Sequence, residues 1–155
     1  MQLGIKQSVG IILGLMLLGS TAALAKDKVV LSLQQDPATD GLEAACVALQ
    51  LGTGLLKSGK KKAKVTIFAT LDGVYIADEN TYEGTPICET FNGVELGEAP
   101  LRGVLNGFLD AGGEVLLCPL CFTVRQDSYE LIEDSQIYVA NPIPLLLEAN
   151  KVIDY

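Results

Sequence analysis

The strongest pattern in this chain is Glu114-Val115-Leu116-Leu117-Cys118-Pro119-Leu120-Cys121. Its first half is a short apolar run of the kind that forms a buried strand. Pro119 suits the first position of a helix, which makes Cys118 the expected N-cap residue. The segment therefore predicts a strand that passes directly into a helix, with two thiols at the carboxyl end of the strand. Open α/β folds place their chemistry at that end.

Strand and helix patterns alternate along the rest of the sequence. Apolar, β-branched runs predict four further strands, at residues 29–33, 65–70, 137–140 and 152–154. Apolar residues at helical spacing predict helices at residues 40–58, 100–111 and 143–149, and a short helical turn at 128–133. Such alternation gives parallel β-α-β units, so the expected fold class is α/β, a three-layer α/β/α sandwich with a mostly parallel sheet.

The first helix and the long segment after the second strand need separate comment. Asp40 stands three residues before Glu43, which is a capping-box pattern for the start of the helix. Cys46 lies on the apolar face of that helix and is expected in the core. Residues 71–97 are too long for an ordinary connection in a compact domain. This segment, which contains Cys88, is expected either to be a functional loop or to contain a short regular element.

The N-terminus has the three parts of a secretory signal peptide. Lys6 supplies a positive start, residues 9–18 are apolar, and Ala23-Leu24-Ala25 is an A-x-A cleavage site. Cleavage after residue 25 would leave a mature chain that begins at Lys26 and has the size of one domain, in the periplasm or outside the cell. The alternative is an uncleaved anchor, although the apolar run is short for a membrane span. After cleavage we expect no stable association with a membrane.

Composition excludes several classes of function. The chain has 11 basic and 19 acidic residues, a net charge of −8, which disfavours nucleic acid as a partner. It contains no histidine, which excludes catalytic and metal-binding schemes that need imidazole. A single C-x-x-C lacks a second ligand pair for zinc, and neither G-x-S-x-G nor a phosphate-binding Gly-Lys-Ser/Thr motif occurs. We therefore expect no metal and no cofactor.

The four cysteines are the remaining candidates for chemistry. In an oxidising compartment they could form two disulfides, with three possible connectivities. A domain of this size, rich in Val, Leu and Ile, does not need disulfides in order to fold. The even number of cysteines therefore does not by itself establish a disulfide framework.

Cys118 is the cysteine best placed to react. As an N-cap residue, its sulfur would face unpaired backbone amides and the positive end of the helix dipole, and both lower the pKa of a thiol. Arg125, about two turns further on, adds a positive charge. The thiolate could attack a disulfide or hold a terminal sulfur as a persulfide. Cys121 could resolve a mixed disulfide or protect Cys118 reversibly. The competing interpretation is that both thiols are small buried hydrophobic residues.

The sequence around the motif resembles a known family. Residues 105–113, Leu-Asn-Gly-Phe-Leu-Asp-Ala-Gly-Gly, followed by residues 115–121, resemble the signature of DsrE/DsrF-like proteins, the family related to DsrEFH and TusBCD. Residues 68–74 and 151–155 are similar to other segments of that family. The resemblance covers most of residues 26–155, which we interpret as one DsrE-like domain. It implies a five-stranded parallel sheet between helices, and assembly into homo-oligomers or related hetero-oligomers.

The same resemblance implies a role in sulfur transfer. In the relay members of the family, a cysteine carries persulfide sulfur between proteins. Cys118 matches its position, and Arg125 follows at a similar spacing. The relay members are cytoplasmic and lack a counterpart of Cys121. The C-P-x-C motif of this chain instead resembles variants in the wider family.

Three functions follow from these observations, in order of preference. The first is a sulfur carrier, sulfurtransferase-like, that holds sulfane sulfur as a persulfide on Cys118 between sulfur donors and acceptors, which are proteins or small sulfur compounds. The second is an exported thiol–disulfide redox protein that uses Cys118 and Cys121 as a couple. The third is a non-catalytic, oligomeric binding module that holds a ligand with its long loop.

Overall fold

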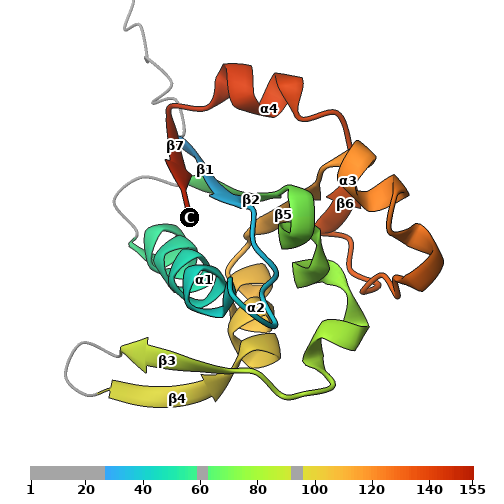
Figure 1. Cartoon of the computed structure of the whole chain (residues 1–155). Helices are drawn as coiled ribbons and strands as arrows, with labels where there is room; N and C mark the ends of the chain where they lie inside the picture. The colour runs from blue at the N-terminus through green and yellow to red at the C-terminus, as the bar shows by residue number, and fades with distance from the viewer. Residues whose placement is uncertain (1–26, 59–62, 92–95) are drawn as a thin grey trace, which may run out of the picture.

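The computed structural model describes residues 27–58, 63–91 and 96–155. The expected signal peptide, residues 1–25, lies outside the described residues. Five strands form one parallel sheet in the order β6-β5-β2-β1-β7 (Figure 1). Their bounds are β1 Lys28–Leu33, β2 Lys64–Ala69, β5 Glu114–Leu117, β6 Ile137–Val139 and β7 Lys151–Asp154. The parallel five-stranded sheet predicted from the sequence is confirmed.

Helices lie on both faces of the sheet. Figure 1 shows α1 (Leu42–Lys57) and α2 (Leu101–Asp110) on one side and the short α4 (Ile143–Glu148) on the other. Alternate residues of the central strands, among them Leu31 and Ile67, are fully buried in the core beneath α1 and α2. This pattern arises because successive side chains of a strand point to opposite faces.

Phe108 fixes the packing of α2 against α1 and β5. A Cβ atom on Gly113 would lie 2.3 Å from Cζ of the Phe108 ring, and one on Gly52 of α1 would lie 2.7 Å from Cε2. The ring therefore fills space that only glycine leaves open. Gly112, with φ of 89°, ends α2, and the Gly113 amide donates to the Phe108 carbonyl at 3.0 Å. The helix expected at residues 100–111 is thereby confirmed, with Gly112 and Gly113 at its end.

The long segment after β2 contains regular structure. It forms two 3₁₀ helices, η1 (Leu71–Ala77) and η2 (Glu79–Tyr82), and an antiparallel hairpin of β3 (Ile87–Phe91) and β4 (Leu96–Pro100). The hairpin lies beyond α1 and α2, away from the parallel sheet (Figure 1). Of the two alternatives expected for this segment, a functional loop or a segment with short regular structure, the structure shows the short elements.

A disulfide joins the hairpin to the first helix. Cys46 of α1 and Cys88 of β3 are both buried, with an S–S distance of 2.04 Å. Cys46 lies in the core, as predicted, but as half of a disulfide rather than as a separate thiol. The bond closes a sequence separation of 42 residues, and such a cross-link stabilises the fold chiefly by restricting the unfolded chain.

Two local predictions were wrong. The capping box at Asp40 does not form, because α1 begins at Leu42 after the N-cap Gly41, and no side chain caps it. Instead, the carbonyl of Asp36 accepts the Gly41 amide at 2.8 Å, so a tight turn precedes the helix.

The helical turn expected at residues 128–133 is also absent from the described structure. A 3₁₀ helix, η3 (Gln126–Ser128), occurs earlier, and the chain then runs extended beside η2. Leu131 forms an antiparallel bridge with Asp78, and the Glu79 amide donates to the Glu130 carbonyl at 2.8 Å. Pairing with a neighbouring segment has replaced the local helical hydrogen bonds.

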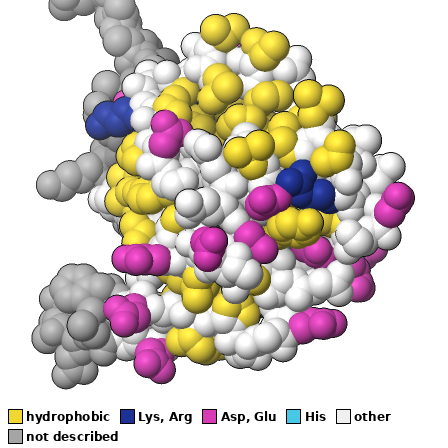
Figure 2. Space-filling view, viewed as in Figure 1, with side chains coloured by type: hydrophobic (Ala, Val, Ile, Leu, Met, Phe, Trp, Pro, Cys, Tyr) yellow, Lys and Arg dark blue, Asp and Glu magenta, His cyan; other side chains and the backbone are white. Residues whose placement is uncertain are grey.

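The outer surface of α4 is apolar. Figure 2 shows hydrophobic side chains gathered over this helix, and Leu147 is 81% exposed. In the described parts of the chain, no helix combines the length and apolarity that crossing a membrane requires.

The contact between Phe108 and Gly113 provides a test of the packing. Gly113→Ala should lower the free energy of unfolding by about 1–3 kcal/mol, because the new methyl group overlaps the ring. The matched control is Gly107→Ala in α2, where an added Cβ meets nothing within 4 Å. The control should raise the free energy of unfolding by about 0.5–1 kcal/mol, because alanine restricts the unfolded chain. Urea unfolding of both variants measures the difference; equal effects would contradict this packing.

Candidate functional site

Cys118 lies at the junction that the sequence predicts. Its amide donates to the Ala69 carbonyl at 2.9 Å, which extends the pairing of β5 with β2 by one residue. It is the N-cap residue of α3 (Pro119–Thr123), with Pro119 in the first turn. The change from strand to helix thus occurs at Cys118 itself, at the carboxyl end of the sheet.

The two free cysteines are in direct contact. The Sγ atoms of Cys118 and Cys121 are 2.8 Å apart, and both residues are half-buried. The Cys121 thiol donates to the Cys118 sulfur, and the Cys121 amide lies 3.5 Å from the same atom. Cys118 is therefore the hydrogen-bond acceptor of the pair.

A backbone amide from the segment that follows the neighbouring strand β2 completes the site. The Leu71 amide, at the start of η1, lies 3.2 Å from the Cys121 sulfur. Leu71 has φ of 49°, a conformation that is uncommon and strained for a residue with a branched side chain. The strained conformation occurs at the residue whose N–H group points at the Cys121 sulfur.

The position of Leu71 is fixed by close packing of η1 against the end of β1. A Cβ atom on Gly73 would lie 2.2 Å from the Leu33 carbonyl oxygen, so only glycine allows this approach. The Gly73 amide donates to the Gln34 carbonyl at 3.0 Å. The ends of β1, β2 and β5 are thereby held together around the two thiols.

The pKa of Cys121 is raised above its ordinary value. Burial of the thiol is the main cause, and its hydrogen bond to Cys118 acts in the same direction. The Leu71 amide and the positive charge of Arg125 lower the pKa, but by less. Cys121 is consequently held as a protonated donor to Cys118 at neutral pH.

Arg125 lies next to the thiol pair and contacts the backbone and side chains around it. Its guanidinium donates to the Cys121 carbonyl at 2.9 Å, forms an ion pair with Asp72 and lies over the Tyr75 ring, 5.7 Å from the centroid. The hydrogen bond to Asp72 is the main reason why the pKa of Arg125 is raised. Arg125 thus links α3 to η1 through the Cys121 carbonyl and the Asp72 carboxylate.

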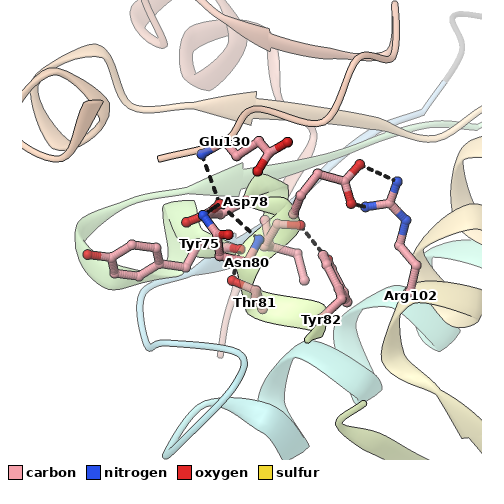
Figure 3. Close-up of polar contacts among 9 residues, drawn as sticks. Tyr75, Asp78, Asn80, Thr81, Tyr82, Arg102 and Glu130 are labelled. Atoms are coloured by element: carbon pink, nitrogen blue, oxygen red, sulfur yellow. Dashed lines mark hydrogen bonds and ion pairs between the residues drawn. The ribbon is translucent and has the colours of Figure 1, made fainter. Parts of the chain in front are cut away.

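A buried carboxylate at the junction of η1 and η2 accepts hydrogen bonds from the surrounding backbone. Asp78 is buried, and its carboxylate accepts the amides of Asn80 at 3.1 Å and Glu130 at 3.0 Å (Figure 3). The Thr81 hydroxyl donates to the Tyr75 carbonyl at 2.6 Å. These bonds, together with the bridge between Asp78 and Leu131, hold the 3₁₀ segment in place.

Two tyrosines and one ion pair complete this support. The Tyr82 hydroxyl donates to the Ile76 carbonyl, and the Tyr129 hydroxyl donates to the Val74 carbonyl at 2.6 Å. Burial raises the pKa of both phenols, so they remain protonated donors. Arg102 of α2 binds Glu79 through two hydrogen bonds of 2.8 and 3.0 Å (Figure 3).

Exposed apolar residues occur on the two segments that carry the site, at the start of η1 and along α3 to its C-cap. Leu120 is 80% exposed, Val124 is 78% exposed and Leu71 is 56% exposed. We call these three residues the apolar rim. Exposed apolar residues that gather beside a reactive group are typical of a surface on which another protein docks.

Other sites are less developed. Across residues 27–58, 63–91 and 96–155, no three His, Cys, Asp or Glu side chains are grouped so as to hold a metal ion. A groove of about 770 Å³ lies between α1 and β3, with Asp40, Glu43 and Glu89 among its lining residues. Neither free cysteine lines this groove.

The sequence missed two residues of the site. Leu71 contributes a backbone amide, for which no side-chain pattern exists, and Asp72 pairs with Arg125, 53 residues further along the chain. The one available signal was Gly73, which follows them directly after a buried strand.

Comparison with solved structures supports the fold. The chain is similar to the crystal structure of the ychN protein from E. coli, with a TM-score of 0.56 and 17% identity, over 83% of this chain and 99% of that chain. That protein has a DsrE/DsrF-like fold, which agrees with the fold expected from the sequence. No family model matches the chain, and no curated protein matches it.

The ion pair between Arg125 and Asp72 gives a test of the electrostatics. Asp72→Asn should increase the rate at which iodoacetamide labels Cys121 by about twofold to tenfold, because an unneutralised Arg125 lowers the thiol pKa. Arg125→Gln should decrease the rate by a similar factor. Peptide mass spectrometry at neutral pH measures both rates.

Asp127→Asn is the matched control, because it makes the same change of charge at an exposed position in η3. It should leave the rate within about twofold of the wild-type value. A shift in the same direction for Asp72→Asn and Arg125→Gln would contradict the role given to Arg125.

Proposed function

We propose that this protein is a DsrE-like sulfur carrier, in which Cys118 accepts sulfane sulfur as a persulfide and passes it to a partner. The observation that carries the proposal is the contact between the two thiols. Cys118 accepts the hydrogen bond from Cys121 at the open carboxyl end of the sheet. The sulfur that would carry the cargo is thus the better nucleophile of the pair.

The transfer needs no cofactor. The Cys118 thiolate attacks the terminal sulfur of a persulfide or polysulfide donor, the donor's S–S bond breaks, and the donor leaves as a thiolate with the bonding pair. An acceptor thiolate then attacks the outer sulfur of the Cys118 persulfide. The Cys118 thiolate leaves and is ready for another sulfur.

Protein partners and export belong to the same proposal. The apolar rim suits a sulfur donor or acceptor that is itself a protein, because it would cover exposed Leu120 and Val124 during transfer. The exposed apolar side chains of α4, such as Leu147, support self-association. The N-terminal signal pattern supports a periplasmic or secreted location, with the mature chain beginning at Lys26.

Thiol–disulfide exchange is the second candidate function. The distance of 2.8 Å between the sulfurs favours it, since a disulfide requires them to approach to about 2.05 Å. In that case Cys121 is essential for every turnover, whereas sulfur uptake by a carrier requires Cys118 alone. The Cys121→Ser variant separates the two functions.

Sulfur uptake is measured by mass spectrometry after the protein, with Cys118 and Cys121 reduced, is exposed to inorganic polysulfide. Cys121→Ser should gain sulfur on Cys118 as a persulfide, at a rate within about threefold of the initial wild-type rate. Cys118→Ala should gain none at position 118 and at least about tenfold less on Cys121, because burial, the main cause of the raised pKa of Cys121, remains in this variant.

Two outcomes would contradict the proposal. Absence of any adduct on Cys118 in Cys121→Ser would exclude a carrier. Disulfide-exchange activity in the wild type, together with loss of both disulfide exchange and sulfur uptake in Cys121→Ser, would favour the redox function instead.

A further inference from the structure

We propose that Cys121 gives the sulfur carried on Cys118 a second exit, in which the sulfur leaves as hydrogen sulfide and a Cys118–Cys121 disulfide forms. This inference rests on the proposed persulfide on Cys118. It assigns Cys121 the reaction that decides the fate of the sulfur when no acceptor is bound.

The geometry selects the sulfur that Cys121 attacks. In a persulfide, Cys118 Sγ is the inner sulfur and the cargo is the outer one. Cys121 Sγ lies 2.8 Å from Cys118 Sγ, so only a fraction of an ångström separates this contact from a disulfide bond. The outer sulfur is left for an external acceptor, because the inner one is already opposed by Cys121.

The step balances without another reactant. Cys121 Sγ forms a bond to Cys118 Sγ, and the bond between Cys118 Sγ and the outer sulfur breaks. The outer sulfur leaves with the bonding pair and takes up the proton from Cys121, which gives hydrogen sulfide. Two thiol sulfurs are oxidised to a disulfide, and the sulfane sulfur is reduced by two electrons. A dithiol reductant then restores Cys118 and Cys121.

The surroundings of Cys121 suit a thiol that reacts only after loading. Before loading, burial and the hydrogen bond to Cys118 keep its pKa high. Once Cys118 Sγ is the inner sulfur of a persulfide, any negative charge lies on the outer sulfur and not on the atom that faces Cys121, so the repulsion of a Cys121 thiolate is weaker. The Leu71 amide, 3.2 Å from the Cys121 sulfur, remains in place to stabilise that thiolate.

The two exits therefore compete for different sulfur atoms. A partner thiol attacks the outer sulfur and leaves Cys118 reduced, whereas Cys121 attacks the inner sulfur and leaves a disulfide. A docked partner on the apolar rim favours transfer, because it brings its thiol to the outer sulfur first.

The experiment loads the full chain with inorganic polysulfide, removes the excess by gel filtration without oxygen, and follows released sulfide with monobromobimane. The wild type should release one sulfide for each Cys118 persulfide, and peptide mapping should show an equal amount of Cys118–Cys121 disulfide. In Cys121→Ser the persulfide should persist, with sulfide released at least about tenfold more slowly.

The outcomes separate this inference from the proposed function. A persulfide that is as long-lived in the wild type as in Cys121→Ser overturns the second exit and leaves the carrier intact. Sulfide release without a Cys118–Cys121 disulfide also overturns it. If Cys118 takes up no sulfur even in Cys121→Ser, the carrier itself fails.

The pH dependence gives an independent readout. Because the attacking group is the Cys121 thiolate, and burial, the main cause of its raised pKa, persists after loading, the rate of sulfide release should increase with pH across the neutral range, by up to about tenfold per unit. A rate that is independent of pH between about 6 and 8 would overturn the assignment of Cys121 as the attacking group.

Discussion

The parallel pairing of β2 with β5 is the constraint on which the site depends. The register places Ala69 beside Leu117, and the bond from the Cys118 amide to the Ala69 carbonyl continues the ladder by one residue. The two chains then diverge, one into η1 and the other into α3. Because both leave the sheet at the same level, the Leu71 amide meets the Cys121 thiol. Neither segment could form this arrangement alone.

The chemistry of the site follows from the close packing and bonding of the segments around the two thiols. Gly73 is pressed against the end of β1, Asp78 anchors the following turn, and Arg125 joins η1 to α3 through Asp72. The strained backbone of Leu71 is maintained by these contacts. A thiol pair held in this way differs in its two members, because one sulfur accepts and the other donates. That difference is what the proposed roles of a carrier cysteine and a resolving cysteine require.

The sequence was informative where local chemistry sets the structure. Buried strands were visible as apolar runs, and Pro119 located the N-cap at Cys118, because a proline at the first helical position has a direct physical cause. The rest depended on contacts distant in the chain. Asp40 does not cap the first helix, because a turn closed by the Asp36 carbonyl precedes it. Leu71 acts through a backbone amide that no side-chain pattern reveals.

Disulfide mapping of the mildly oxidised protein tests the central claim most directly, since it reports which sulfurs can meet. The structure already pairs Cys46 with Cys88, and the contact between Cys118 and Cys121 predicts that these two form the second disulfide within the same chain. Digestion without reductant, followed by mass spectrometry, should yield these two pairs alone. A Cys118 paired with Cys46 or Cys88, or a Cys118 that stays reduced beside an oxidised Cys121, would contradict the account.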